Sequence, residues 1–335
     1  MEVQKHKYLH ERIEQALGAR AHLLDPIHAS ALRLFNGFYE GCPELVVDLY
    51  GRTLVLFSYA QEPEISFELL QDVQGYLLEM LAWVDCVVQK IHTSKNPQER
   101  KGLISFGRNP CDQVMEHGIW YAVDLRMNQD TSLYLDTRNL RGWLLENARD
   151  WDVLNTFAYT GSLGVAALAG GASRVVQVDR SRKFLELSRR TCTLNHLEQD
   201  RMELAVTDFF SAIARFKRNG DLFDCVVADP PFFSTTDKGM VSLVDESTRI
   251  INKLRPLVKD GGRLVIINNA LFLSGADYLS SVLQLCRDGY LEIETILPVP
   301  VDFTGYPQTI IGKPPVNPAP FIHPTKMVVL RVKRK

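Results

Sequence analysis

The chain has 335 residues, of which 46% are apolar and 23% charged, a composition typical of soluble globular proteins rather than disordered or fibrous ones. This length exceeds the roughly 100 to 200 residues of one typical domain, so we expect two domains. Lysine and arginine together number 38 against 40 acidic residues. The formal net charge of −2 excludes a polycation that attracts nucleic acid through its overall charge.

The chain shows no membrane segment, secretory signal or metal motif. Its longest apolar runs, such as Val153 to Ala158 and Leu264 to Ile267, fall far short of the roughly 20 residues that a membrane-spanning helix needs. The start, Met1 to Lys7, leads into polar sequence, so we expect a cytoplasmic protein. The six cysteines form no C-x-x-C pair and no zinc spacing, and we expect reduced thiols and no bound metal.

Residues 1–126 mix short strand and helix patterns and are predicted to form a small α+β domain. Leu45 to Leu49 and Thr53 to Tyr59 predict two strands joined by a turn at Gly51. Glu64 to Trp83 predicts an amphipathic helix.

Residues 127–335 alternate short apolar runs with helical stretches, which is typical of a parallel sheet covered on both faces. Seven runs predict strands: Val153 to Tyr159, Arg174 to Asp179, Glu203 to Val206, Asp224 to Asp229, Arg263 to Asn269, Leu291 to Pro300 and Lys326 to Lys333. Helices are predicted between the first six: Leu163 to Ala169, Lys183 to Asn195, Phe209 to Lys217, Val241 to Val258 and Asp277 to Arg287. The last two runs are separated by a Pro-rich loop, Lys313 to Pro324, so they should pair antiparallel. We therefore expect an α/β, Rossmann-like sheet of order 3-2-1-4-5-7-6 with strand 7 antiparallel, and a ligand site beside strand 1.

The turn after the first of these strands is rich in glycine. Gly161 lets the backbone approach a ligand closely, at the start of a helix whose N–H groups are available. The segment does not match G-x-G-x-x-G, because Asn155, Phe157 and Tyr159 stand where a dinucleotide fold has small residues. This departure counts against NAD or FAD.

Acidic residues follow the next two strands. Asp179 ends the second strand, where a carboxylate accepts hydrogen bonds from ribose hydroxyls, although a solvated strand-end aspartate is the alternative. Asp208 follows the third strand. It is suited either to an adenine amino group or to capping the helix that begins at Phe209, and the sequence leaves both open.

The fourth strand runs into Asp229, Pro230, Pro231 and Phe232. Two prolines fix the backbone as it leaves the sheet, so the Asp229 carboxylate and an aromatic ring are held at the mouth of the site. A planar amine or ring nitrogen could be gripped between the hydrogen bond and the stacking surface. A Pro-rich turn with core phenylalanines is the structural alternative.

Four stretches resemble class I S-adenosylmethionine-dependent methyltransferases and, more closely, the RlmI- and RlmK-like family of large-subunit (23S) ribosomal RNA methyltransferases: Tyr134-Leu135-Asp136-Thr137-Arg138, Leu154 to Gly161, Val178-Asp179 and Asp229 to Phe233. Leu32 to Phe35 and Glu44 to Tyr50 are similar to the small central domain of that family. The resemblance covers nearly the whole chain. It implies S-adenosylmethionine as the cofactor and methyl transfer as the activity.

The resemblance also implies roles for individual residues. The candidate cofactor-binding residues are Tyr134, Arg138, Asn155, Phe157, Tyr159, Thr160, Gly161, Asp179, Arg180 and Asp208. Among them, Arg138 would help to hold the cofactor's carboxylate, since a guanidinium matches it bidentately. The turn from Asn155 to Gly161 would wrap the methionine end, and Asp179 would bind the ribose. The candidate catalytic residues, Asp229, Pro230, Pro231 and Phe232, would present the target atom.

The sequence departs from the family in three places. We find no room for the N-terminal PUA-type RNA-binding domain, because the small domain begins almost at once. Asp130-Thr131-Ser132 replaces a Lys-Thr-Gly, and Thr137 replaces a glutamine. Members that methylate cytosine at carbon 5 place a cysteine after strand 5, where this chain has Asn268-Asn269-Ala270. That reaction needs a thiolate nucleophile, so we favour direct attack by a nitrogen lone pair.

Two basic segments are candidate RNA contacts, residues 90–108 and 331–335, although such runs are usually solvated faces. Three hypotheses remain open. The favoured one is methylation of a base nitrogen in ribosomal RNA. The second is methylation of a protein side-chain amide or a small molecule, and the third is an inactive cofactor-binding assembly factor. A homodimer is left open.

Overall fold

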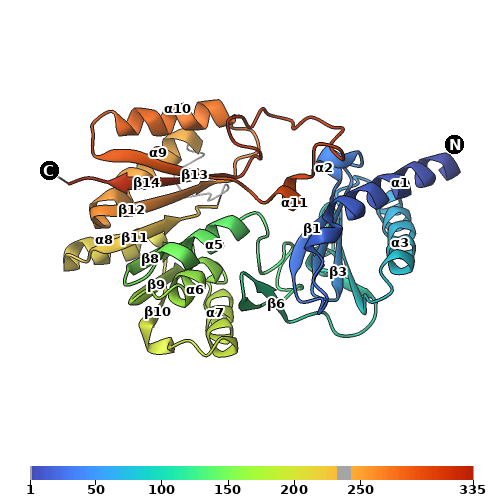
Figure 1. Ribbon diagram of the computed structural model, residues 1–335, viewed down its shortest axis with the longest axis horizontal. Coiled ribbons are helices and arrows are strands. Elements are labelled where there is room, and N and C mark those ends of the chain that lie inside the picture. Colours follow the sequence, from blue (N-terminus) through green and yellow to red (C-terminus); the bar gives the residue numbers. More distant parts are fainter. Residues whose placement is uncertain (1, 232–242, 335) are drawn as a thin grey trace. The chain divides into compact units, whose positions relative to one another are not determined.

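The computed structural model describes residues 2–231 and 243–334 (Figure 1). Internal contacts divide the chain into two compact units, Met1–Leu135 with Pro300–Pro314, and Asp136–Val299 with Pro315–Lys335. The boundary predicted at residue 126 differs from this division because the following residues pack on the first unit. There the buried Tyr50 hydroxyl donates to Leu133 O at 2.9 Å.

The first unit contains a five-stranded sheet of order β1-β2-β3-β4-β5, in which β3 and β4 pair parallel and the other neighbours antiparallel. Its elements are α1 (Glu2–Arg20), η1 (Ala21–Leu23), β1 (Ala31–Asn36), α2 (Gly37–Glu40), β2 (Leu45–Tyr50), β3 (Thr53–Ser58), α3 (Pro63–Met80), β4 (Cys86–Ile91), α4 (Pro97–Lys101), β5 (Leu103–Phe106), the hairpin β6 (Gln113–Glu116) and β7 (Ile119–Ala122), and α11 (Val301–Thr304). Alternate residues of β1 to β4 form a core with α1 and α3, which lie side by side in Figure 1.

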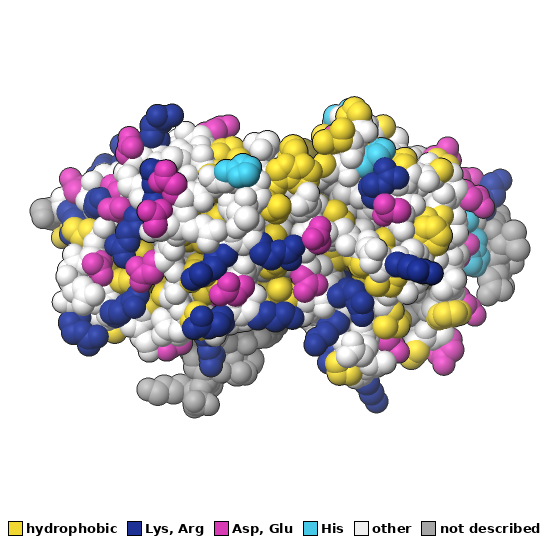
Figure 2. Space-filling view, turned by 90° about the horizontal axis from the view of Figure 1, so that it is seen from below, with side chains coloured by type: hydrophobic (Ala, Val, Ile, Leu, Met, Phe, Trp, Pro, Cys, Tyr) yellow, Lys and Arg dark blue, Asp and Glu magenta, His cyan; other side chains and the backbone are white. Residues whose placement is uncertain are grey.

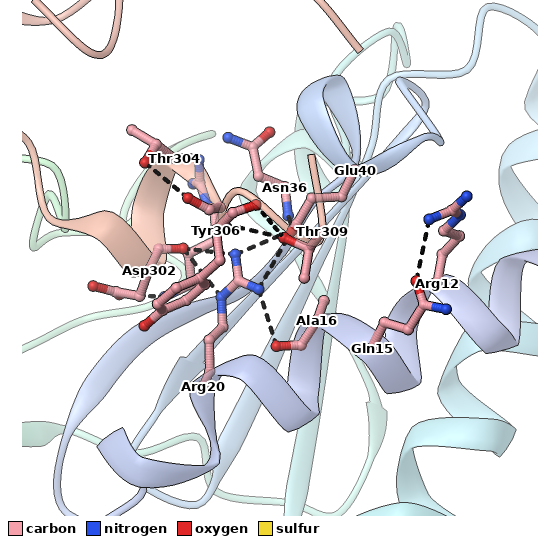
Figure 3. A network of polar contacts seen from close by, with 12 residues as sticks. Arg12, Gln15, Ala16, Arg20, Asn36, Glu40, Asp302, Thr304, Tyr306 and Thr309 are labelled. Carbon is pink, nitrogen blue, oxygen red and sulfur yellow. Dashed lines mark hydrogen bonds and ion pairs between the residues drawn. The ribbon is translucent and has the colours of Figure 1, made fainter. Parts of the chain in front are cut away.

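Pro300–Pro314 is anchored in the first unit by a buried ion pair, shown in Figure 3. The guanidinium of Arg20 donates to both Glu40 carboxylate oxygens at 3.0 and 3.1 Å and to the carbonyl oxygen of Asp302 at 2.9 and 3.1 Å. Thr309 Oγ1 donates to Glu40 Oε1. Arg20 and Glu40 are both 0% exposed, so each charge depends on these partners.

The second unit is built on a seven-stranded sheet of order β10-β9-β8-β11-β12-β14-β13, with β14 antiparallel to both neighbours. Its elements are α5 (Arg138–Asn147), β8 (Asp152–Thr156), α6 (Ser162–Ala169), β9 (Arg174–Asp179), α7 (Arg182–Leu194), η2 (Gln199–Arg201), β10 (Met202–Val206), α8 (Phe209–Asn219), β11 (Phe223–Ala228), α9 (Leu243–Leu254), η3 (Arg255–Leu257), β12 (Val258–Asn268), α10 (Gly275–Cys286), β13 (Leu291–Leu297) and β14 (Lys326–Val332). In chain order this is 3-2-1-4-5-7-6, which confirms the predicted Rossmann-like order and the reversed last strand.

Helices cover both faces of the second unit's sheet, as its continuous apolar strands require. Alternate strand residues such as Leu154, Val226 and Leu264 form one core with α8, α9 and α10. On the opposite face lie α5, α6 and α7, and α5 packs on α6 (Figure 1). Side chains in a strand alternate between the two faces of the sheet, so residues an even number of positions apart contact the same set of helices. This rule places the polar residues described below.

No helix within residues 2–231 and 243–334 is long and apolar enough to cross a membrane. Over the same ranges, no three His, Cys, Asp or Glu side chains are grouped so that they could hold a metal ion.

Candidate active site

The turn from β8 into α6 is tightly wound. Phe157, Tyr159 and Gly161 all have positive φ, of 56°, 51° and 77°. Two non-glycine residues in this region carry backbone strain, which concentrates at functional sites. The turn is fixed to the neighbouring strands, since Ala158 N donates to Val178 O at 2.9 Å and Thr156 Oγ1 donates to Val227 O at 2.8 Å. The backbone therefore presents a preformed loop at the carboxyl end of the sheet.

A buried amide, Gln177 of β9, supports this turn from below. Its Oε1 accepts a hydrogen bond from Asn155 Nδ2 at 2.9 Å, and its Nε2 donates to Gly161 O at 3.1 Å. A Cβ at either Gly161 or Gly164 would lie 2.5 Å from the Gln177 amide. The glycines are thus required by packing as well as by any ligand. Asn155 is 1% exposed, so its side chain acts on the turn through Gln177.

The aromatic side chains of the turn have protein partners. Phe157 stacks on Phe209 with ring centroids 4.6 Å apart, and Tyr159 meets the edge of Phe184 at 4.8 Å. Thr160 is buried. The rings hold the loop against α7 and α8, and their predicted contacts with the cofactor stay predictions.

Asp179 lies at the end of β9 with both carboxylate oxygens engaged by backbone. Tyr159 N donates to Oδ2 at 2.9 Å, and Ser181 N donates to Oδ1 at 2.8 Å. Burial raises the pKa of Asp179, while these hydrogen bonds oppose the rise. A carboxylate oxygen has two lone pairs, so each can still accept a ribose hydroxyl. Arg180, the next residue, is exposed.

Asp208 caps helix α8, as one of the two predicted alternatives requires. Ser211 N donates to its Oδ1 at 3.1 Å, and hydrogen bonds from Ser211 lower the pKa of Asp208. The adenine contact predicted for the same residue stays a prediction.

Asp229 follows directly on β11 and is half-buried. Burial raises its pKa to about 7, and the charge of Asp136 adds to this rise. Pro230 is half-buried and Pro231 exposed, so the chain leaves the sheet toward the surface. Phe232, the fourth predicted catalytic residue, lies outside the described residues.

Sequence reasoning missed three polar residues of this edge, Gln177, Asp136 and Thr325. Thr325 Oγ1 donates to Asp136 Oδ2 at 2.8 Å. Asp136 stands two residues before Arg138, which is half-buried at the start of α5. Gln177 could have been noticed in the sequence because it is a polar residue between Val176 and Val178, in the apolar middle of a predicted strand. Tyr134 belongs to the first unit, where its hydroxyl donates to Asp130 Oδ2 at 3.4 Å.

The end of β12 carries amides rather than a thiol. Asn268 Nδ2 donates to Ser247 Oγ at 3.0 Å, and Lys326 Nζ donates to Ala270 O at 3.0 Å. Cys225 on β11 is 0% exposed, and burial raises the pKa of its thiol well above the ordinary value. A thiol in this state is a poor nucleophile.

Comparison with known proteins decides the family. The model of the S-adenosylmethionine-dependent methyltransferase family matches residues 51–287. The chain belongs to this family. A large-subunit ribosomal RNA methyltransferase I of Tolumonas auensis is 32% identical over 226 residues, which cover 67% of this chain and 57% of the relative. The Escherichia coli O139:H28 protein of the same name is 29% identical over 260 residues, covering 77% and 65%. The chain thus spans about three fifths of the length of these relatives.

Solved methyltransferase structures share the fold of this family member. A Streptococcus mutans protein described as a SAM-dependent methyltransferase matches with a TM-score of 0.82 at 20% identity, covering 98% of this chain and 81% of that one. A second structure, of a protein described as a methyltransferase and complexed with SAH, gives 0.83 at 21% identity, covering 98% and 82%. A tRNA m1G37 methyltransferase of M. jannaschii gives 0.54 at 14% identity, covering 86% and 75%.

Proposed function

We propose that this chain transfers the methyl group of S-adenosylmethionine to a base nitrogen of ribosomal RNA, without a covalent enzyme intermediate. The observation that carries the proposal is the edge formed by β8, β9 and β11, where the strained turn, Asp179 and Asp229 follow three adjacent strands. The carboxyl ends of adjacent parallel strands beside the switch point are where α/β sheets bind ligands. The relatives named as ribosomal RNA methyltransferases support the choice of RNA.

The residues of the turn fit the cofactor. Helices α7, α8 and α10 each begin with a side chain that accepts a hydrogen bond from the first turn, namely Ser181, Asp208 and Ser274. Helix α5 has no such side-chain cap, and neither has helix α6, whose N-cap residue is Gly161. The first N–H groups of α6 therefore suit the carboxylate of a bound amino acid moiety, and Arg138 can pair with the same group. Asp179 would accept the ribose hydroxyls. SAH, bound in one of the similar structures, carries the same adenosine and amino acid groups.

When bound, the cofactor supplies a methyl group on a positively charged sulfur. The acceptor nitrogen would take that methyl group through its lone pair, with the S–C bonding electrons left on sulfur, and a nitrogen that carries a proton would pass it to water. Asp229 and the two prolines after it would hold the acceptor in line. Alignment and exclusion of water then supply the rate enhancement. The buried Cys225 and the amides after β12 offer no thiolate for a covalent route.

The basic segments differ in what they can offer RNA. At 331–335, Arg331 Nε donates to Glu294 Oε2 at 2.9 Å, and Lys333 Nζ lies 2.6 Å from Glu292 Oε2, so two of the charges are paired. In the segment 90–108, Lys90 is buried and binds the carbonyls of Asn128 and Asp130. Burial lowers its pKa to about 8.

The exposed basic residues of the segment 90–108 are Lys95, Lys101 and Arg108. Figure 2 shows Lys and Arg side chains interspersed with Asp and Glu over the face that it draws. Because Lys95, Lys101 and Arg108 are exposed, we infer that these three residues contact phosphates and position the RNA without reading its sequence.

The test is transfer of a labelled methyl group by the purified chain. Ribosomal RNA and total protein from cells that lack the chain serve as parallel acceptors, followed by nucleoside mass analysis. Label in an N-methylated nucleoside of ribosomal RNA is the expected result. Label found only in protein would show that the substrate is protein and not RNA. SAH binding without methyl transfer would indicate an inactive assembly factor. Lys95→Glu, Lys101→Glu and Arg108→Glu together should raise the KM for RNA and leave SAH binding unchanged.

A further inference from the structure

The loop that leaves β12 carries two exposed apolar side chains at the carboxyl edge of the second unit's sheet. Leu271 is 66% exposed and Phe272 is 62% exposed. Strand β11 pairs parallel with β12 so that Ala228 lies beside Ile266, and Asp229 therefore leaves the sheet next to the last residues of β12. Neighbouring strands lie about 4.8 Å apart. The loop with the two exposed side chains thus begins beside the residue proposed to present the acceptor.

Hydrogen bonds fix the backbone of this loop. Ala270 N donates to Asn268 Oδ1 at 3.1 Å, and Nζ of the buried Lys326 donates to Ala270 O at 3.0 Å. The same Nζ donates to Pro324 O, so one ammonium group joins the loop to the segment before β14. Leu273, the residue after the exposed pair, packs against the core. The exposed pair is therefore held by anchored residues on both sides.

The segment before β14 adds a further apolar side chain to this surface. Gly275 N donates to Asn317 O at 3.0 Å, and a Cβ at Gly275 would lie 1.7 Å from Pro318 O, so the segment packs against the start of α10. Ile322 in that segment is 46% exposed. Residues 268–276 and 315–326 contain no aspartate or glutamate. An apolar surface without acidic groups suits RNA, because acidic side chains would repel its phosphates.

One polar side chain directly before the loop lacks a donor. Asn269 Oδ1 is buried and accepts no hydrogen bond from the part of the chain that the structure describes. Buried acceptors in folded proteins are nearly always paired, so a donor from outside the chain is expected here. A ribose 2′-hydroxyl or a base amino group would supply one. This orphaned acceptor is a second observation that points to a ligand at the end of β12.

The proposed reaction explains why apolar side chains are exposed at this place. A base in structured RNA is stacked between its neighbours, and an enzyme that modifies the base must first move it out of the stack. The extrusion leaves a gap between the neighbouring bases. Phenylalanine and leucine are among the side chains that enter such gaps as wedges in nucleic-acid complexes. An aromatic ring in the gap replaces part of the base stacking that is lost.

We propose that Leu271 and Phe272 form a wedge that enters the RNA stack where the target base has left it. This inference rests on the proposed function. The wedge stabilises the RNA with the base extruded, and it takes no part in cofactor binding or in the transfer step itself. Its contribution is therefore confined to structured RNA.

The first test compares methyl transfer to folded and to denatured RNA. Ribosomal RNA from cells that lack the chain is folded in Mg²⁺ or is heat-denatured and kept without Mg²⁺. Phe272→Gln should lower kcat/KM on folded RNA by about 10- to 100-fold, because the stacking of one ring on a base is lost. Leu271→Gln should lower it by less, and Phe272→Trp, which keeps a ring, should leave it unchanged. On denatured RNA all three variants should match the wild type.

The matched control is Leu283→Gln, since Leu283 is 51% exposed on α10 of the same unit. This variant should change neither rate. SAH calorimetry and thermal unfolding should agree among all variants, because each replaces an exposed side chain. An unchanged kcat/KM of Phe272→Gln on folded RNA would overturn the inference. An equal loss on folded and denatured RNA would overturn it as well, because a wedge acts only where a stack must be opened.

The second test locates the contact without methyl transfer. Ultraviolet light cross-links aromatic side chains to the bases on which they stack. Trypsin releases residues 264–287 as one peptide, since no lysine or arginine lies between Arg263 and Arg287. Cross-linked nucleotides should be found on this peptide in the wild type and not in Phe272→Gln. A wild-type peptide without nucleotides would overturn the inference.

Sedimentation of the free protein tests a second copy of the chain as the alternative occupant of this surface. The wild type and Phe272→Gln should sediment alike. A dimer that forms in the wild type and not in Phe272→Gln would overturn the wedge and assign the exposed pair to contact between copies.

The proposed function and the wedge fail separately. A wild-type chain that transfers no methyl group to RNA would refute the proposed function, and the cross-link would still decide whether Phe272 enters an RNA stack. Transfer to folded RNA that Phe272→Gln leaves intact would refute the wedge alone.

Discussion

The packing of helix α6 against Gln177 makes a sharp prediction for Gly164→Ala. A Cβ at Gly164 would lie 2.5 Å from Gln177 Oε1 and 2.6 Å from Cδ, so the buried amide must move. Its movement breaks the hydrogen bonds to Asn155 and Gly161, worth about 1 kcal/mol each. The strain of overpacking adds about 1 to 3 kcal/mol. The better helix propensity of alanine returns about 1 kcal/mol, so we expect a net loss of about 2 to 4 kcal/mol.

The matched control is Gly75→Ala in the middle of α3, where an added Cβ meets nothing within 4 Å. This variant should gain up to about 1 kcal/mol from the same change of propensity. Urea unfolding measures both variants, and hydrogen exchange of peptides from β9 and α6 assigns the loss to the second unit. SAH titration should show weaker binding only for Gly164→Ala, since Gly161 depends on the same amide. Equal stabilisation of the two variants would refute the reasoning about Gln177.

Three further predictions concern charged groups. The pKa of Asp229 in the folded protein, about 7, exceeds the ordinary 3.8, so the folded protein binds more protons than the unfolded chain between these pH values. The free energy of unfolding of the wild type should therefore fall as the pH rises through that range. Urea unfolding from pH 4.5 to 8 should show this fall in the wild type and a flatter dependence in Asp229→Asn. Asp179→Ala removes the acceptor for two backbone N–H groups and the predicted ribose contact. Calorimetry with SAH should therefore give a Kd that is higher by about 100-fold. An unchanged Kd would exclude Asp179 from the cofactor site. Arg20→Met leaves the Glu40 charge buried without its guanidinium and should lower the free energy of unfolding by about 3 to 5 kcal/mol. Adding Glu40→Gln to the same chain should restore part of this loss. Identical thermal unfolding of the single and the double variant would contradict this reasoning.

The sheet of the second unit could be predicted because its strands are short apolar runs. Arg174–Asp179 was predicted with the bounds that the structure shows. The reversed last strand was predicted because the sequence indicated no crossover helix before it, and the structure has only the four-residue α11 between β13 and β14. The site at the carboxyl edge followed from strand order alone. Asp179 and Asp229 could therefore be placed there without coordinates.

The rest of the edge depends on partners far apart in the chain. Asp136 and Thr325 are separated by 189 residues, and no local periodicity connects them. The cap formed by Asp208 was one of two local possibilities, and the Ser211 N–H shows that it forms, while the adenine contact stays a prediction. The hydrogen bond from Asn155 to Gln177 likewise joins two neighbouring strands and could not be predicted from the sequence, and the cofactor contact that the resemblance implies for Asn155 stays a prediction.

The anchoring of Pro300–Pro314 by Arg20 has a consequence for biosynthesis. The ribosome makes α1 first, yet the carbonyl that Arg20 binds belongs to Asp302, 282 residues later. The nascent first unit can pair Arg20 with Glu40 early, but the hydrogen bonds from Arg20 to Asp302 O wait for almost the whole chain. A fragment excised at the end of the small domain would lack this segment, and co-translational chaperones would meet it in the same incomplete state.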